Sequence, residues 1–223
     1  MEFKVVKTSD DPLFKEALSL YDGKLDIALL EDEQTFVQSL ENKHTKDDYV
    51  FLVGIEDNTV VSLATAHYEA TTHSAFLIYL IASDREDHDD IISLTLEQIE
   101  LKINELAQYT HDRDVNFIMF EVPQAPLSTT PEEEEVLKQR RLFLRQYGFE
   151  KQTDIDYRLP PLHGERNNMP MDLYIKSNIE LTKDIYGTSV KSNYILKYVF
   201  ANRIPRSVIY PILEEMGLHK STT

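Results

Sequence analysis

The sequence has 223 residues, 42% of them hydrophobic, and a formal net charge of −16 at pH 7 from 39 acidic and 23 basic residues. This length is enough for one domain with a substantial core and a small appendage. The charge argues against nucleic acid or an anionic membrane as a partner and favours a cationic or amine partner, although a negative surface also serves solubility alone. The absence of cysteine excludes disulfides, thiolate nucleophiles and cysteine-ligated metals.

The sequence offers no recognisable targeting segment. The N-terminal segment, residues 1–7, is too short and too charged for a signal peptide. No apolar segment approaches the length of a membrane span. We therefore expect a cytoplasmic protein.

The N-terminal half predicts strands and two helices. Residues 3–8 alternate apolar and polar side chains as a half-buried strand does, and helical patterns follow to about residue 21 and over 32–40. Residues 49–55 and 59–70 are β-rich and are joined by a short polar link that is typical of an antiparallel hairpin. With the apolar run that follows, they predict an antiparallel meander.

That run, residues 75–82, has no polar alternation and therefore predicts a strand covered on both faces. An acidic loop, 83–90, leads from it into the longest amphipathic helix pattern of the chain. The apolar stripe of this helix is Ile92, Leu96, Ile99, Ile103 and Leu106. Since ligands of open α/β sheets bind where strand ends meet helix N-termini, this loop is the first place to expect a site.

The second half continues with a strand over 116–122, for which a parallel crossover is expected after the helix. Thr130-Pro131 begins a capped helix that should run to Tyr147, where Gly148 supplies a left-handed stop. Two last strands are predicted over residues 151–159 and 171–177.

Beyond Ser177 the pattern is helical, over about 189–202 and 205–216. We expect a domain over residues 1–177 and a helical extension over 178–223. Several apolar side chains of the extension should pack on the domain or on another subunit, so a homodimer through these helices is possible. They are Tyr194, Ile195, Tyr198, Val199 and Phe200.

The order of these elements resembles the GCN5-related N-acetyltransferase (GNAT) superfamily over about residues 3–177. The most specific local match is residues 141–150, Arg-Leu-Phe-Leu-Arg-Gln-Tyr-Gly-Phe-Glu, which resembles the aromatic-rich helix that ends in Gly-Phe in that family. A second match is the closing hairpin, 156–162 with 171–176. The resemblance implies an α/β (α+β) fold with a mixed, mostly antiparallel central sheet flanked by helices, and a C-terminal helical appendage.

The resemblance also implies a function, acetyl-CoA-dependent transfer to a small amine or cationic substrate. Acetyl-CoA would be a co-substrate bound in a cleft between the strands 75–82 and 116–122. Backbone groups of the first strand's end would pair with the pantetheine arm, and amides at the helix start would face the pyrophosphate. The residues implied are Leu80, Ile81, Ala82, Ser83, Arg85, Asp89, Asp90, Ile91 and Ile92.

The loop departs from the family pattern, which reads Arg/Gln-x-x-Gly-x-Gly/Ala. Here residues 87–92 contain no glycine, and five carboxylates between residues 84 and 90 place like charge near the expected diphosphate, opposed by Arg85 and His88. Acidic residues at a helix start also stabilise the helix without any ligand. The alternative is therefore a GNAT-fold binding or regulatory protein that has lost CoA binding.

The catalytic groups are also unusual. Leu144 stands where many family members have a tyrosine that protonates the departing thiolate, and Tyr147 is the nearby substitute, unless it only packs at the helix end. Tyr79 is the only side chain with a polar tip in the central strand. Glu121 is the remaining candidate base, unless it is a solvated carboxylate at a strand end.

Other chemistries have weaker signals. His67, His73 and His88 with the loop carboxylates could in principle bind a divalent cation, but the spacing is not diagnostic and we predict no metal site. The sequence has no Gly-x-Ser-x-Gly nucleophile elbow and no glycine-rich phosphate loop. Hydrolase and nucleotide-binding functions are therefore not predicted.

Overall fold

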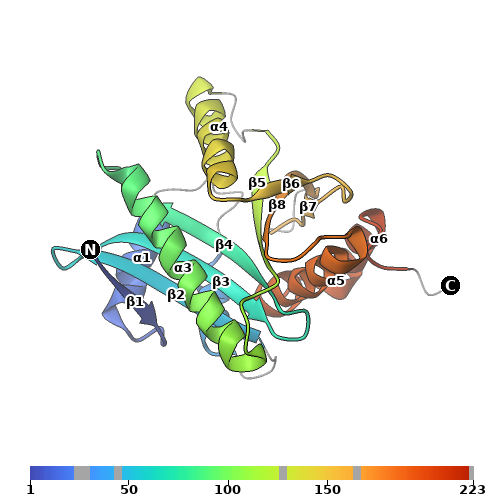
Figure 1. Ribbon diagram of the computed structural model, residues 1–223, viewed down its shortest axis with the longest axis horizontal. Coiled ribbons are helices and arrows are strands. Elements are labelled where there is room, and N and C mark those ends of the chain that lie inside the picture. Colours follow the sequence, from blue (N-terminus) through green and yellow to red (C-terminus); the bar gives the residue numbers. More distant parts are fainter. Residues whose placement is uncertain (23–30, 43–46, 126–129, 163–166, 221–223) are drawn as a thin grey trace. The chain divides into compact units, whose positions relative to one another are not determined.

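A computed structural model describes residues 1–22, 31–42, 47–125, 130–162 and 167–220. The chain forms two compact units, residues 1–115 and 116–223, and each is described by itself. The predicted boundary between residues 177 and 178 separates a domain from a helical extension and does not correspond to this division, so it stays a prediction. The elements of both units are labelled in Figure 1.

The sheet of the first unit is the predicted meander. Its strands are β1 (Glu2–Val6), β2 (Asp47–Glu56), β3 (Thr59–Glu69) and β4 (Ser74–Ala82). They pair in that order, and each pairing is antiparallel. The β2–β3 turn holds Asp57 and Asn58 at φ of 49° and 61°, the left-handed conformation that a tight hairpin requires and that Asp and Asn tolerate.

Three helices cover this sheet on both faces: α1 (Pro12–Asp22), α2 (Glu33–Leu40) and α3 (His88–His111). In Figure 1, α3 passes in front of β2 and β3 while α1 lies behind them. All nine residues of β4 are buried, as the unbroken apolar run predicts. Four residues of the predicted stripe on α3 are buried, but Leu106 is only half-buried and Ala107 takes its place in the core.

Two bulges shape the sheet. One lies in β3 opposite Gly54, because Gly54 pairs with Ser62 and Ile55 with Val60, which leaves Val61 as the extra residue. A Cβ added to Gly54 would collide with Ser62 Oγ, so glycine is required for this close approach. The other lies in β4, because Leu77 pairs with Ala66 and Tyr79 with Thr65, which leaves Ile78 as the extra residue. The sequence of β4 contains no glycine or other signal for this second bulge.

The strands of the second unit are β5 (Phe117–Pro123), β6 (Glu150–Gln152), β7 (Arg158–Leu159) and β8 (Met169–Ser177). β8 pairs antiparallel with each of the other three. The prediction of one strand over 151–159 is therefore wrong. Between β6 and β7 the chain turns toward the next helix, where Asp154 accepts a hydrogen bond from the hydroxyl of Tyr186 at 3.2 Å and Ile155 is buried.

The helices of the second unit are α4 (Pro131–Gln146), α5 (Lys183–Tyr194), the π-helix η1 (Ile195–Ala201) and α6 (Arg206–Glu215). The predicted capping of α4 is confirmed: the N–H of Glu133 donates to the Thr130 side chain, and Gly148 has φ 83°. The helix predicted over 189–202 begins earlier, at Lys183, because Thr182 caps it. It ends in π-helical turns, in which the N–H of Asn202 donates to the carbonyl of Lys197.

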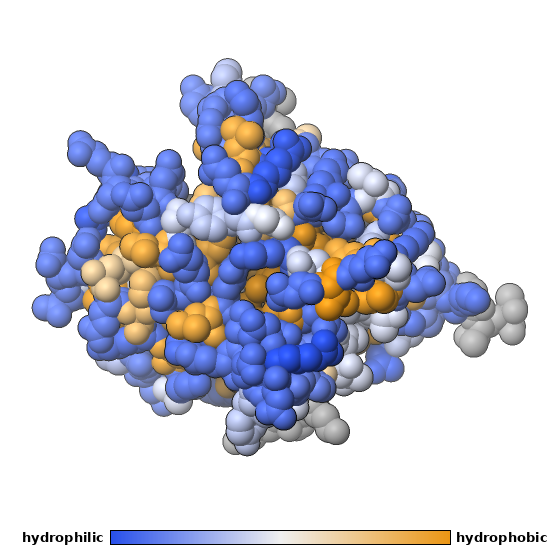
Figure 2. Space-filling view, in the orientation of Figure 1, coloured by the Kyte–Doolittle hydropathy of each residue, from blue (hydrophilic) through white to orange (hydrophobic). Residues whose placement is uncertain are grey.

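The fold class predicted from the sequence is confirmed, since the chain is an α/β protein with predominantly antiparallel strand pairing. Hydrophilic residues cover most of the face seen in Figure 2, with hydrophobic patches among them. Leu94 and Leu101 on α3 contribute exposed apolar surface. No helix in the described ranges combines the length and apolar character that a membrane span needs.

Candidate functional site

The end of β4 is held firmly by β3. Leu80, Ile81 and Ala82 are buried and pair with β3, and the N–H of Ser83 donates to the carbonyl of Val61 at 2.9 Å. The Ser83 amide is therefore already bound within the sheet, and its pairing with a pantetheine arm stays a prediction. Its Oγ is buried and has no hydrogen-bond partner in the described parts of the chain.

Helix α3 begins at His88, which decides which amides the loop can offer. The N–H of His88 donates to the carbonyl of Arg85, and that of Ile91 donates to Asp87 at 3.0 Å. Since a helix leaves the amides of its first turn without intrahelical acceptors, Asp89 and Asp90 are the ones that can face a ligand. The amide of Ile91 is bound within the helix. Ile92 lies one residue further into it, and both isoleucine side chains are in the core.

The basic groups of the loop are already bound. Arg85 forms ion pairs with Glu56 and with Asp87, and the hydrogen bond to Glu56 is the main cause that raises its pKa. The Nδ1–H of His88 donates to the carbonyl of Ser83 at 3.0 Å. The backbone at the helix start thus suits a diphosphate, but the surrounding carboxylates oppose one.

Tyr79 belongs to the core of the first unit. Its ring lies against Tyr21 and Phe36 at centroid distances of 4.9 and 5.7 Å, and its oxygen accepts a hydrogen bond from the Tyr21 hydroxyl at 3.3 Å. Burial, followed by the charge of Glu31, raises the pKa of Tyr79 well above its ordinary value. These contacts give it a packing role, and its catalytic role stays a prediction.

Tyr147 ends α4 and is half-buried. Its ring packs on Phe143 at a centroid distance of 4.7 Å. Its hydroxyl has no hydrogen-bond partner within the described ranges. Leu144, which stands where many members of the resembled family have a tyrosine, is completely buried.

Glu121 on β5 is the centre of a buried polar cluster in the second unit. One carboxylate oxygen accepts from the ammonium of Lys197 at 2.8 Å, and the other accepts from the hydroxyl of Tyr157 at 2.8 Å. The hydroxyl of Tyr198 lies 3.2 and 3.4 Å from the two oxygens. The side chains of Glu121 and Lys197 are only 9% and 6% exposed, so the solvated carboxylate considered from the sequence is wrong.

Two tyrosines beside Glu121, Tyr157 and Tyr194, remain protonated. Burial and the charge of Glu121 raise the pKa of Tyr157 well above its ordinary value, and they do the same for Tyr194. Tyr194 donates to the carbonyl of Arg158 at 2.8 Å, and its ring stands edge-on to Tyr198. The carboxylate therefore faces hydroxyl donors and an ammonium, and its oxygens are occupied.

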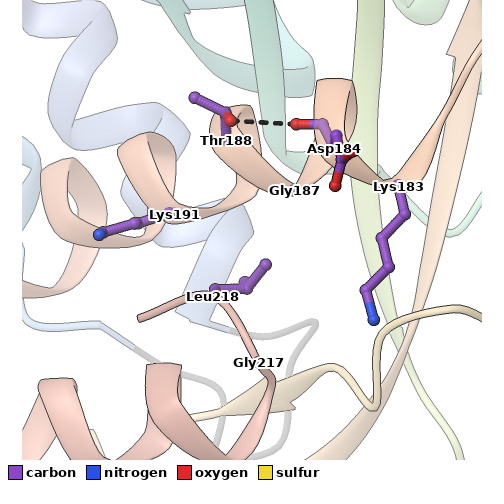
Figure 3. Close-up of a pocket in the computed structure, with 7 residues that line it drawn as sticks. All are labelled: Lys183, Asp184, Gly187, Thr188, Lys191, Gly217 and Leu218. Carbon is purple, nitrogen blue, oxygen red and sulfur yellow. Dashed lines mark hydrogen bonds between the residues drawn. The ribbon is translucent and has the colours of Figure 1, made fainter. Parts of the chain in front are cut away.

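A hollow of about 310 Å³ lies between α5 and the segment after α6. Figure 3 shows Lys183 and Lys191 at opposite ends of it, with the hydroxyl of Thr188 donating to the backbone carbonyl of Asp184. A Cβ on Gly187 would come within 3.2 Å of Leu218, so the glycine allows close packing there. None of the residues predicted to form a site lines this hollow.

The histidines have structural partners. His73 donates through Nε2–H to the carbonyl of Asp114 and accepts at Nδ1 from the Tyr68 hydroxyl, both at 2.9 Å. His67 packs against the ring of Tyr49. The described parts of the chain contain no group of three or more His, Asp or Glu side chains that could hold a metal ion.

Comparison with solved structures gives consistent matches. An acetyltransferase assigned to the GNAT family from Bacteroides thetaiotaomicron superposes with a TM-score of 0.63 at 17% identity, covering 90% of this chain and 99% of the other. An aminoglycoside 6′-N-acetyltransferase in complex with coenzyme A gives 0.51 at 11% identity, covering 82% and 99%. The ribosomal-protein-S18-alanine N-acetyltransferase of Escherichia coli gives 0.50 at 11%, covering 82% and 97%.

The chain has the GNAT fold. This confirms the resemblance drawn from the order of elements and from the helix that ends at Gly148. In sequence, no protein-family model and no curated protein matches the chain. The likeness to the solved GNAT proteins is therefore one of fold, at sequence identities of 11–17%.

Within this GNAT fold, the predicted site residues fall into both units. Tyr79 and the residues of the loop lie in the first, and Glu121 and Tyr147 in the second. Sequence reasoning missed the partners of Glu121, namely Tyr157, Lys197 and Tyr198. One signal was present: Lys197 is the single charged residue in the apolar run 194–200, and a buried lysine requires a partner.

Proposed function

We propose that the protein is an acetyl-CoA-dependent N-acetyltransferase that acts on a small amine or cationic substrate. The observation that carries the proposal is the GNAT fold, which extends over 99% of the length of the Bacteroides thetaiotaomicron protein. The complex of an aminoglycoside acetyltransferase with coenzyme A supports acetyl-CoA as the co-substrate.

The charge of the first unit supports a cationic acceptor. Residues 1–115 contain 25 acidic and 9 basic residues, which accounts for the entire net charge of −16, whereas residues 116–223 contain 14 of each. A surface of one sign raises the local concentration and the association rate of ligands of the opposite sign. The name of one structural neighbour gives aminoglycosides as its substrate class, and aminoglycosides are amine-rich, positively charged molecules.

Acetyl-CoA would supply an activated acetyl group as its thioester. The first-turn amides of α3, at Asp89 and Asp90, are the groups of this chain that would bind the diphosphate. The neutral amine would attack the thioester carbonyl, a C–N bond would form and the C–S bond would break. The amine would release its proton to water, and the thiolate would leave as the thiol after protonation. Since the oxygens of Glu121 are occupied, the chain would promote this attack mainly by positioning.

Tyr147 is the proposed proton donor to the departing thiolate. Tyr79 and Glu121, the other two side chains predicted as catalytic, already have hydrogen-bond partners. The hydroxyl of Tyr147 has none among the described residues. Tyr147→Phe would then lower kcat by about a hundredfold, the lower end of the range for general acid catalysis, without changing acetyl-CoA affinity. An unchanged kcat would contradict the proposed role of Tyr147 as proton donor.

Calorimetric titration with acetyl-CoA, followed by a thiol-release assay with a panel of primary amines, tests the proposal. We expect binding tighter than about 1 mM, which corresponds to roughly 4 kcal/mol, and thiol release that depends on the amine. Desulfo-CoA serves as the control for binding without transfer. Absence of binding heat and of any shift in melting temperature would overturn the proposal.

A second function, a non-catalytic binding or regulatory protein, is favoured by the loop alone. Residues 83–92 contain no glycine, and Arg85 is paired with Glu56 and Asp87. If the fold has lost its co-substrate, removal of loop carboxylates will not restore binding. The double variant Asp89→Asn/Asp90→Asn therefore separates the two functions: binding that appears or tightens supports the enzyme, and continued absence supports the binding protein.

A further inference from the structure

The surroundings of the Lys197 ammonium are those that proteins use to recognise amines. The group lies 2.8 Å from a carboxylate oxygen of Glu121 and 4.9 Å from the centroid of the Tyr198 ring. An ammonium is bound by opposite charge and by the face of an aromatic ring, and both are strongest where water is excluded. Tyr157, Tyr194 and Tyr198 wall this space, and each is at most 2% exposed.

The Glu121 carboxylate and the Tyr157 hydroxyl do not depend on Lys197 for their arrangement. Glu121 belongs to a strand paired with β8, and Tyr157 lies just before β7, which also pairs with β8. The hydroxyl of Tyr157 donates directly to the Glu121 carboxylate. Lys197 and its neighbour Tyr198, by contrast, come from η1, a π-helical stretch, and such stretches are often found at functional sites.

We propose that Glu121, Tyr157 and Tyr198 form a recognition site for a primary ammonium group, and that Lys197 occupies it as an internal substitute for an external amine. The proposal deepens the proposed function by naming the group that holds the acceptor, and in that sense rests on it. An external amine enters when Lys197 withdraws. Glu121 is then the residue that positions the amine.

A purely structural ion pair would behave differently. Its two charges would stay together in the presence of any amine, and a cavity left by the lysine side chain would not distinguish an alkylammonium from a neutral molecule of the same shape. A recognition site discriminates by charge through Glu121. The experiments below use n-butylammonium, which matches the four methylene groups and the ammonium of lysine, and n-butanol as its neutral counterpart.

The first experiment is a titration of the Lys197→Ala variant of the full chain. We expect n-butylammonium to bind it about tenfold or more tightly than it binds Glu121→Gln/Lys197→Ala, since a charge-assisted hydrogen bond is lost in the double variant. n-Butanol should bind both variants equally. Equal affinity of n-butylammonium for the two variants would overturn the proposal.

The second experiment uses the wild-type protein, so it does not depend on the folding of a variant. Amide hydrogen exchange over residues 195–201 is measured by mass spectrometry in n-butylammonium chloride and in sodium chloride at equal concentration. If the external amine displaces Lys197, exchange in this segment rises with n-butylammonium and not with sodium. Identical exchange in the two salts would show a permanent pair and would contradict the proposal.

Neither experiment contains acetyl-CoA. Failure of the amine site would therefore leave acetyl transfer untouched, and a protein that binds n-butylammonium but no acetyl-CoA would retain the site while losing the proposed enzyme. A combined success predicts that Lys197→Ala lowers the KM for a primary amine, because the internal competitor is gone.

Discussion

The two units handle charge in opposite ways. The first carries the full net charge of −16, and the ion pairs among its described residues lie at the surface, as in the pair of Arg85 with Glu56, whose side chains are 40% and 33% exposed. The second has no net charge but buries the pair of Glu121 with Lys197. Exposed charge acts over a distance and is weakened by salt, whereas a buried pair acts locally and strongly. The first arrangement suits attraction of a ligand, and the second suits recognition of one.

Breaking the buried pair should have the largest effect. Lys197→Met removes one charge and leaves the Glu121 carboxylate buried without its cation, which should lower the free energy of unfolding by about 3–5 kcal/mol. Urea denaturation measures this loss in the free energy of unfolding. The double variant Glu121→Leu/Lys197→Met should recover much of the loss, because neither charge remains. A single variant as stable as the wild type would show that water reaches the carboxylate.

Removing one hydroxyl from the same cluster should cost less. Tyr157→Phe deletes the 2.8 Å hydrogen bond to Glu121 and should lower the free energy of unfolding by about 1.5–3 kcal/mol, the range for bonds to a charged group. Tyr109→Phe is the matched control, since Tyr109 is 92% exposed. Equal unfolding midpoints for the two variants would contradict the buried contact.

Neutralising the loop of the first unit tests its exposed charge. Each of Asp89→Asn and Asp90→Asn removes roughly 1 kcal/mol of repulsion from a bound diphosphate and should tighten acetyl-CoA binding about fivefold in low salt. The gain should shrink as ionic strength rises. Glu2→Gln, on β1, is the control of equal charge change. If the increase in acetyl-CoA affinity did not depend on ionic strength, the variants would act through a change in shape and not through charge.

The smallest effect is expected from His73. Burial lowers its pKa and outweighs the hydrogen bond to the carbonyl of Asp114, which raises it. The folded state thus binds fewer protons than the unfolded state just below the ordinary pKa of about 6.5. Stability should therefore fall as the pH drops from 6.5 and stay level above it. Urea midpoints at several pH values measure this, and His73→Asn should flatten the dependence.

Much of the fold could be predicted because its signals are local. The apolar run of β4, the Thr130-Pro131 cap and the stop at Gly148 each depend on a few adjacent residues. The π-helix and the break between β6 and β7 could not be predicted, because they depend on contacts with residues distant in the sequence. Asp154, for example, accepts its hydrogen bond from Tyr186.

The candidate site was less accessible to prediction. The sequence identifies Glu121 and Tyr79 as polar groups on apolar strands, but their burial and partners are decided by packing. Lys197 lies 76 positions from Glu121 along the chain, and no spacing rule connects them. Likewise, which amides of α3 are free depends on the residue at which the helix begins, and helix ends are the least certain part of such a prediction.

The bulge at Ile78 marks the place where β4 can change in length. Loops usually accept inserted or deleted residues, because the strands on either side keep their alignment. Within a paired strand, a one-residue change shifts the residues beyond it by one position and turns them to the opposite face. Ile78 is the exception in β4, because its deletion would leave Leu77 opposite Ala66 and Tyr79 opposite Thr65, so the strand would lose its bulge and keep its register. Natural variation in length should therefore be found before Ser74, after Ala82 or at Ile78 itself.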